Sequence, residues 1–159
     1  MRKSIISVLL VFVFIMTASL SVFAHPATLA DGRESTASNL ITIKKPDTAS
    51  TSTVKTTYSV TGVGKEGVSI CIYTYNGSEY VPQKDESGAV ATYTIGSSGV
   101  FYRQIALKEG ENRICVRAEA DNGSYQLSYL TITVVNSSVM SDISSFSLNM
   151  QSKLNGWLN

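Results

Sequence analysis

Short runs in which apolar and polar residues alternate fill the middle of the chain, from Leu40 to Asn136. Alternation with a period of two is typical of a β-strand with one buried face, because successive side chains point to opposite faces. Gly, Asn and Ser separate the runs at intervals of roughly 8–12 residues, which favours a β-sandwich. The pattern predicts strands over residues 39–45, 53–61, 67–75, 79–83, 89–95, 100–107, 112–120 and 125–135.

The same alternation assigns one face of each strand to a shared core. We expect this core to contain Ile41, Ile43, Tyr58, Val60, Val68, Ile70, Ile72, Phe101, Ile105, Leu107, Ile114, Val116, Ala118, Leu130, Ile132 and Val134. The turn at Asn122-Gly123 decides how the last two strands pair. A two-residue turn would set outward-facing Cys115 against inward-facing Leu130, whereas a three-residue loop with Gly123 in the left-handed region restores matched faces. We therefore predict the three-residue loop.

These spacings resemble those of the immunoglobulin-like modules of bacterial secreted and surface proteins. The resemblance covers about residues 40–136 and is carried by Tyr58-Ser-Val60-Thr-Gly62, Val68-x-Ile70 and Gly99-x-Phe101-x-x-x-Ile105-x-Leu107-x-x-Gly110-x-Asn112-x-Ile114-x-Val116-x-Ala118. It implies an all-β, immunoglobulin-like sandwich of seven or eight strands. Such modules serve as spacers, as adhesins and as accessory domains of glycan-active enzymes. The chain departs from the usual pattern in its cysteine pair.

The N-terminal segment, residues 1–24, has the three zones of a secretory signal. Two positive residues precede an apolar run over 5–16, and small residues stand before His25 at a peptidase site. We expect cleavage there and a secreted, extracellular or cell-surface product. The alternative is an uncleaved anchor, because the uncharged run nearly reaches the ~20 residues that a spanning helix needs. Residues 25–39 are small, polar and aperiodic, which predicts a flexible leader.

Cleavage would also remove two of the 13 Lys and Arg residues, leaving 11 against 12 Asp and Glu, a net charge of −1. A nearly neutral chain of scattered charges gives no electrostatic case for nucleic acid or acidic membrane surfaces as partners. We expect an extracellular protein or glycan partner instead.

Cys71 and Cys115 each interrupt an apolar run at an outward-facing position. In an immunoglobulin-like sandwich their strands would be the third and sixth, which are neighbours in one sheet. The resemblance thus implies two thiols side by side on the outer face of that sheet. Export favours oxidation, so we predict a cross-strand disulfide. The alternative is a reactive thiol whose pKa Arg113 and Arg117 would lower.

Candidate catalytic and metal-binding residues are few. His25 is the only histidine, so neither a two-histidine copper site nor a Ser–His catalytic centre is expected. The paired carboxylates fall at turns or strand ends rather than in a predicted cleft. We therefore expect a protein that is not an enzyme and that has no metal and no cofactor.

Tyrosine and arginine dominate the predicted outer face of the cysteine-bearing sheet. These residue types are typical of binding surfaces, although tyrosine is also simply a favoured strand residue. The possible binding face comprises Tyr73, Tyr75, Tyr80, Arg113, Arg117, Tyr125 and Tyr129.

The C-terminal tail, residues 137–159, has apolar residues at helical spacing and few charges, which favours an amphipathic helix that contacts protein rather than a membrane surface. Three alternatives stay open: this helix folds onto its own sandwich, docks on a partner, or stays frayed. Its stripe includes Ile143, Phe146, Met150, Leu154 and Trp157.

The expected function is that of a secreted, non-catalytic immunoglobulin-like module that mediates protein or surface contacts in a structural or adhesion role. The alternative is a carbohydrate-binding accessory protein that uses the exposed Tyr and Arg face.

Overall fold

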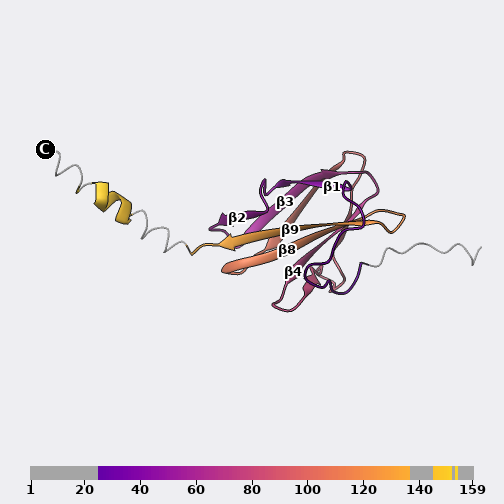
Figure 1. Ribbon diagram of the computed structural model, residues 1–159, viewed down its shortest axis with the longest axis horizontal. Coiled ribbons are helices and arrows are strands. Elements are labelled where there is room, and N and C mark those ends of the chain that lie inside the picture. Colours follow the sequence, from indigo (N-terminus) through magenta and orange to yellow (C-terminus); the bar gives the residue numbers. More distant parts are fainter. Residues whose placement is uncertain (1–24, 137–144, 152, 154–159) are drawn as a thin grey trace, which may run out of the picture.

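The computed structural model describes residues 25–136, 145–151 and 153, and residues 25–136 form an all-β sandwich of two sheets (Figure 1). The smaller sheet has the strand order β1-β3-β7. The larger sheet has the order β2-β9-β8-β4-β5, with β6 pairing β4. The strands are β1 Ile41–Lys45, β2 Ser50–Thr53, β3 Thr57–Gly64, β4 Ser69–Tyr75, β5 Tyr80–Pro82, β6 Thr92–Thr94, β7 Val100–Ala106, β8 Gly110–Glu119 and β9 Tyr125–Val134.

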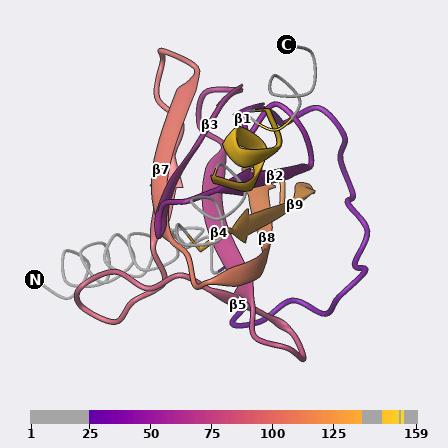
Figure 2. The same ribbon diagram turned by 90° about the vertical axis from the view of Figure 1, so that its left-hand side faces the viewer.

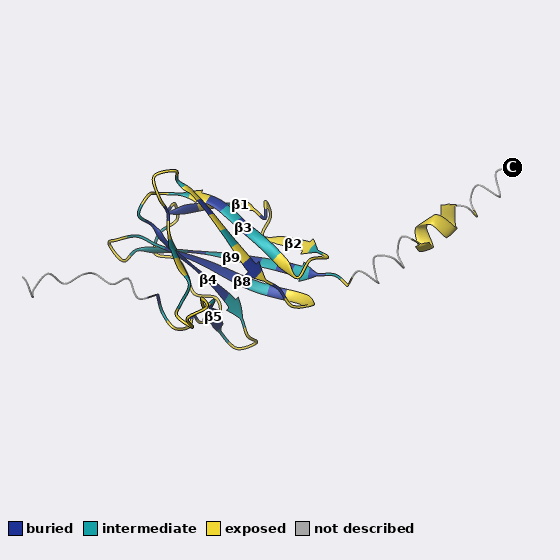
Figure 3. Ribbon diagram, turned by 180° about the vertical axis from the view of Figure 1, so that it is seen from behind, coloured by how far each residue is buried: buried dark blue, intermediate teal, exposed yellow. Residues whose placement is uncertain are grey.

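The alternating residues predicted for the core do meet between the two sheets. All of them belong to one cluster, in which Ile43 and Tyr58 are partly buried and the rest are buried. Figure 3 shows the deepest burial along β4 and β8, while the connecting loops are exposed. The fold class predicted from the sequence is therefore confirmed at the level of an all-β sandwich.

One predicted strand is wrong in its extent. The run 53–61 was expected to be a single strand, but the chain forms β2, turns at residues 54–56, and then begins β3 in the other sheet. β2 has the sequence STST and pairs with β9 in parallel. It buries little surface, so backbone hydrogen bonds rather than an apolar face position it, and alternation of hydrophobicity does not reveal such a strand.

The predicted three-residue loop between the last two strands is confirmed. Gly123 has a φ of 80°, and its N–H donates to the carbonyl of Ala120 at 2.9 Å. This left-handed conformation favours glycine because it lacks a Cβ. As a result Cys115 lies opposite Tyr129, and both side chains are on the outer face.

Residues 25–37, which we call the strap, cross the outer face of the larger sheet. Figure 2 shows this indigo segment running outside the sheet and past β5. Leu29 forms an isolated bridge with Tyr80, each N–H donating to the other's carbonyl at 2.9 Å. Further along, the N–H groups of Thr36 and Ala37 both donate to the carbonyl of Tyr125. A segment expected to be a flexible leader thus has specific backbone partners here.

The two ends of the sequence are only partly described. Residues 145–151 are helical, and Phe146 and Met150 in this helix are exposed. The remaining members of the predicted interaction stripe, Ile143, Leu154 and Trp157, lie outside the described residues, as does the signal predicted over 1–24. Among the helices that the structure describes, none combines the length and apolarity needed to span a membrane.

Candidate functional site

The outer face of the larger sheet brings together all seven residues of the predicted binding face and both cysteines. The pairing registers place them in cross-strand rows, with outward-facing side chains at every second residue. β8 contributes Arg113, Cys115 and Arg117, β4 contributes Cys71, Tyr73 and Tyr75, β9 contributes Tyr125 and Tyr129, and β5 contributes Tyr80.

The strap buries the centre of this face, and here the predicted exposed surface is wrong. Tyr73, Tyr80 and Arg117 are almost completely buried. They lie in or beside a second apolar cluster in which Leu29 of the strap covers the two cysteines. The hydroxyl of Tyr73 is satisfied inside the structure, because it donates to the carbonyl of Pro26 at 2.9 Å. These three side chains are therefore buried rather than open to a ligand, and Tyr73 also holds the strap through its hydroxyl group.

The cysteines are buried and unbonded, so the predicted disulfide is not present in this structure. Their strands are neighbours in one sheet, as expected, but Cys71 lies opposite Arg117 and Cys115 lies opposite Tyr73. The thiols are thus diagonal neighbours. Diagonal side chains in a sheet are separated by about 7–8 Å, whereas the Cβ atoms of a disulfide are about 3.8 Å apart. The register explains why no bond joins them.

Burial also removes the reactivity that the neighbouring arginines were expected to confer. It raises the pKa of Cys71 to about 11 and the pKa of Cys115 to about 12. The charge of Arg117 opposes both shifts, but the loss of hydration outweighs it because the thiolate is the charged form. Both thiols therefore stay protonated at neutral pH.

We predict that neither cysteine of the native protein reacts with Ellman's reagent at pH 7.5. Both should react once guanidinium chloride unfolds the chain in the absence of a reductant, because both pKa values then return toward about 8.5. Absorbance at 412 nm gives the number of thiols directly. No reaction after unfolding would show that the two sulfurs are bonded, and two fast reactions in the native state would show that the strap does not cover them.

His25 anchors the start of the strap. Its Nε2 lies 2.9 Å from Oγ of Ser69, and its Nδ1 lies 3.6 Å from Oε2 of Glu119. That carboxylate oxygen also accepts a hydrogen bond from Nη1 of Arg117 at 2.6 Å. The order hydroxyl, imidazole, carboxylate is that of a hydrolytic triad. However, Nδ1 makes no hydrogen bond and the imidazole is buried, so the arrangement supports an anchor rather than a nucleophile.

The anchor predicts a pH dependence of stability. Burial, with a smaller contribution from Arg117, lowers the pKa of His25 from 6.5 to about 4. Between these two values the unfolded chain binds the proton and the folded chain does not, so the free energy of unfolding falls as the pH drops from about 6.5 to about 4. Urea unfolding across this range, compared between the wild type and His25→Asn, measures the contribution. A difference that does not change with pH would contradict it.

Around the strap, tyrosines and arginines form a stacked and partly exposed set that we call the rim: Arg33, Tyr75, Arg113, Tyr125 and Tyr129. The guanidinium of Arg113 lies 4.3 Å from the ring centre of Tyr75, and that of Arg33 lies 5.2 Å from the ring centre of Tyr125. Tyr129 donates its hydroxyl hydrogen to the carbonyl of Arg33 at 2.8 Å. Cation–π stacking and hydrogen bonds therefore fix these side chains in position.

The strap supplies two members of this site that sequence reasoning missed, Asp31 and Arg33. Nη2 of Arg113 donates to both carboxylate oxygens of Asp31, at 2.7 and 2.8 Å. Nε of Arg33 donates to the hydroxyl of Tyr125 at 3.1 Å. Neither residue stands in an alternating run, so the sequence offers no signal that would place it on the sheet.

A pocket of about 300 Å³, the rim pocket, opens between the strap, β2 and β9. Its walls combine Tyr129 with the Arg113–Asp31 pair and with Ser50 and Thr131 of the two strands. The complete lining is Asp31, Gly32, Ala49, Ser50, Tyr80, Arg113, Tyr129, Leu130 and Thr131.

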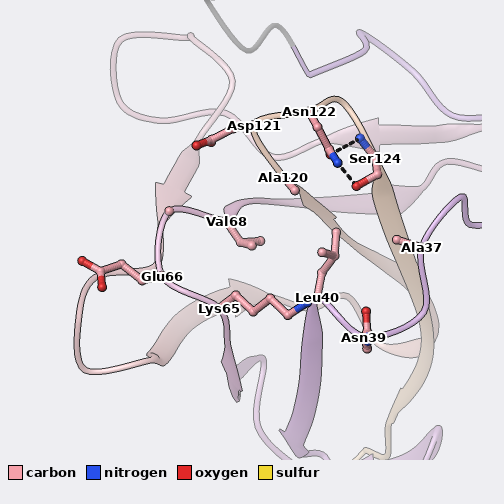
Figure 4. A pocket seen from close by; sticks show the side chains of 11 residues that line it. Ala37, Asn39, Leu40, Lys65, Glu66, Val68, Ala120, Asp121, Asn122 and Ser124 are labelled. Carbon is pink, nitrogen blue, oxygen red and sulfur yellow. Dashed lines mark hydrogen bonds between the residues drawn. The ribbon is translucent and has the colours of Figure 1, made fainter.

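A second pocket of about 450 Å³ lies at one end of the sandwich, where the β3–β4 loop, the β8–β9 loop and residues 37–40 meet (Figure 4). Leu40, Val68 and Ala120 lie around its middle, while Glu66 and Asp121 point away from it. Its described lining has no aromatic side chain. We call this the end pocket.

Within the described ranges, no group of three or more His, Cys, Asp or Glu side chains is placed to hold a metal ion. The fold and the site together define an all-β sandwich whose N-terminal strap covers one sheet. No family model matches the chain, and no curated protein matches it in sequence.

Proposed function

We propose that the protein is a secreted, non-catalytic immunoglobulin-like module that makes protein or glycan contacts at the cell surface, in a structural or adhesion role. The observation that carries this proposal is the rim, where tyrosines and arginines are partly exposed and already held in position. Tyr and Arg are enriched at binding surfaces, and ordering such side chains before binding lowers the entropy cost of association.

The strand order supports the immunoglobulin-like part of the proposal. In that fold strands A, B, E and D share one sheet, and strands C, F and G share the other. In chain order β1, β3 and β7 correspond to A, B and E, and β4, β8 and β9 correspond to C, F and G. Among the described strands, D has no counterpart beside β7, because β5 and β6 both pair with β4 in the larger sheet. Export is supported by the three-zone pattern of residues 1–24.

The test is retention of the purified, fluorescently labelled protein on intact cells of the organism that produces it. The double variant Arg113→Ala/Tyr129→Ala should lose at least about fivefold in retention, because it removes the two rim side chains that also line the rim pocket. Tyr102→Ala is the matched control, since this tyrosine is 57% exposed but lies on the smaller sheet. Equal retention of all three proteins, or no retention of the wild type, would refute the proposal.

A second candidate function is that of a carbohydrate-binding accessory protein. The strap buries too much of the predicted Tyr and Arg face for that face to bind a sugar as a flat aromatic surface. The rim pocket is the observation that favours this candidate, because it combines an exposed aromatic ring with paired polar groups.

A further inference from the structure

We infer that the rim pocket binds a neutral sugar ring of a glycan. The inference rests on the second candidate function above and names the chemical class of its ligand. It is carried by three observations: a fixed aromatic wall, a neutralised pair of charged groups, and a volume that suits a small carbohydrate.

The aromatic wall is the ring of Tyr129, whose residue is 36% exposed. Tyr80 packs against it with the ring centres 5.6 Å apart and the planes tilted by 55°. The hydroxyl is held by the carbonyl of Arg33 at the other end of the side chain. A ring fixed in this way offers the negative face of its π-system to the weakly positive C–H groups of a pyranose.

The polar groups of the rim pocket suit hydroxyl ligands. Asp31 binds only Nη2 of Arg113, and a guanidinium has five N–H donors in a planar fork. The pair therefore presents both donors and acceptors to a sugar, and Ser50 and Thr131, which carry hydroxyl groups, line the same pocket. A bound sugar needs these donors and acceptors, because each of its hydroxyl groups that loses water without gaining a hydrogen bond to the protein lowers the affinity.

Charge selects the class of sugar. Asp31 neutralises Arg113 at close range, so among its described lining residues the rim pocket has no unpaired positive charge to attract a carboxylate or sulfate group. An acidic sugar would also approach the carboxylate of Asp31, and like charges repel. The ligand favoured by this arrangement is uncharged.

The volume is consistent with one or two sugar rings. At about 300 Å³ the rim pocket is at the lower end of the range of small-molecule sites, about 300–1,000 Å³. The end pocket is larger, but its described lining offers no aromatic wall, and it carries Lys65, Glu66 and Asp121 around it. Because a sugar ring can stack on an aromatic side chain in the rim pocket but not on the described lining of the end pocket, the rim pocket is the better candidate.

The experiment is a titration of ¹⁵N-labelled protein with soluble oligosaccharides, followed by amide chemical shifts. The neutral probes are the hexamers of β-1,4-glucose, β-1,4-N-acetylglucosamine, β-1,4-xylose and β-1,4-mannose, and the acidic probe is trigalacturonic acid. At least one neutral probe should shift the amides of Gly32, Ser50 and Thr131. Tyr129→Ala should weaken that binding at least about tenfold, whereas Tyr102→Ala should leave it unchanged.

Ser50→Trp provides a second variant that fills the pocket from an exposed edge strand and should abolish the shifts without removing a core side chain. The inference is overturned if no neutral probe binds, if trigalacturonic acid binds more tightly than all of them, or if both pocket variants bind like the wild type. Retention on cells that depends on the rim, combined with no glycan binding, would leave the contact function standing and remove only this inference.

Discussion

Replacing Leu29 with alanine is expected to lower the free energy of unfolding by about 2–5 kcal/mol, the range for removing a buried leucine side chain. Leu29 is the strap residue that closes the second apolar cluster, above Cys71 and Cys115, and it is 1% exposed. Its loss leaves a cavity over both thiols and weakens the hold of the strap on β5. Guanidinium unfolding followed by circular dichroism measures the change.

The same variant should also expose the thiols. We expect Cys71 and Cys115 to react with Ellman's reagent in the folded Leu29→Ala protein, far faster than in the wild type. Leu148→Ala is the matched control, because this leucine is 67% exposed and its replacement should change stability by less than about 0.5 kcal/mol. A Leu29→Ala protein with unchanged stability and protected thiols would show that the strap does not depend on this contact.

The second large effect is expected at Gly62 of β3, where the backbone of β1 and the ring of Phe101 on β7 leave no room for a side chain. A Cβ built there lies 2.5 Å from the carbonyl oxygen of Thr42 and 2.5 Å from Cε1 of Phe101. One of these atoms belongs to the backbone of β1, so it cannot rotate away. Gly62→Ala should therefore destabilise the protein by about 3 kcal/mol or more, at the upper end of the cost of overpacking a core.

Gly96→Ala is the control for this substitution. Gly96 has no left-handed φ, and a Cβ there meets nothing within 4 Å. The added methyl group should change the unfolding midpoint little, and it removes some freedom from the unfolded chain. If both alanine variants unfold at the same denaturant concentration as the wild type, the packing of β1, β3 and β7 around Gly62 differs from that described here.

The core of this fold could be predicted because it depends on local alternation. Each strand buries every second residue, so the sequence alone identifies the apolar face, and Gly123 identifies the register of the last hairpin. β2 could not be predicted in the same way. Its four residues are Ser and Thr, and only a parallel partner about 80 residues away in the chain makes them a strand.

The sequence predicts which residues belong to the candidate site, but it does not predict which of them are exposed to solvent. Alternation places tyrosines, arginines and cysteines on one face of the larger sheet, whereas their burial depends on a segment with no periodic pattern. The disulfide prediction failed for a related reason. The β4–β8 register joins strands that no tight turn connects, so a shift of two residues, from opposite to diagonal, leaves the inward and outward faces unchanged and is invisible in the sequence.

The strap also sets an order of events during folding. Its residues are synthesised before every strand of the two sheets, but they bind groups that lie far along the chain. Thr36 pairs with Tyr125 across 89 positions, and Arg33 pairs with Tyr129 across 96. Residues 33–37 of the strap therefore cannot dock until β9 has been made and paired with β8, whereas Pro26 and Leu29 have partners on β4 and β5, which are made earlier. Contacts of such long range form late and slowly, so the second half of the strap stays undocked until the last strand has arrived.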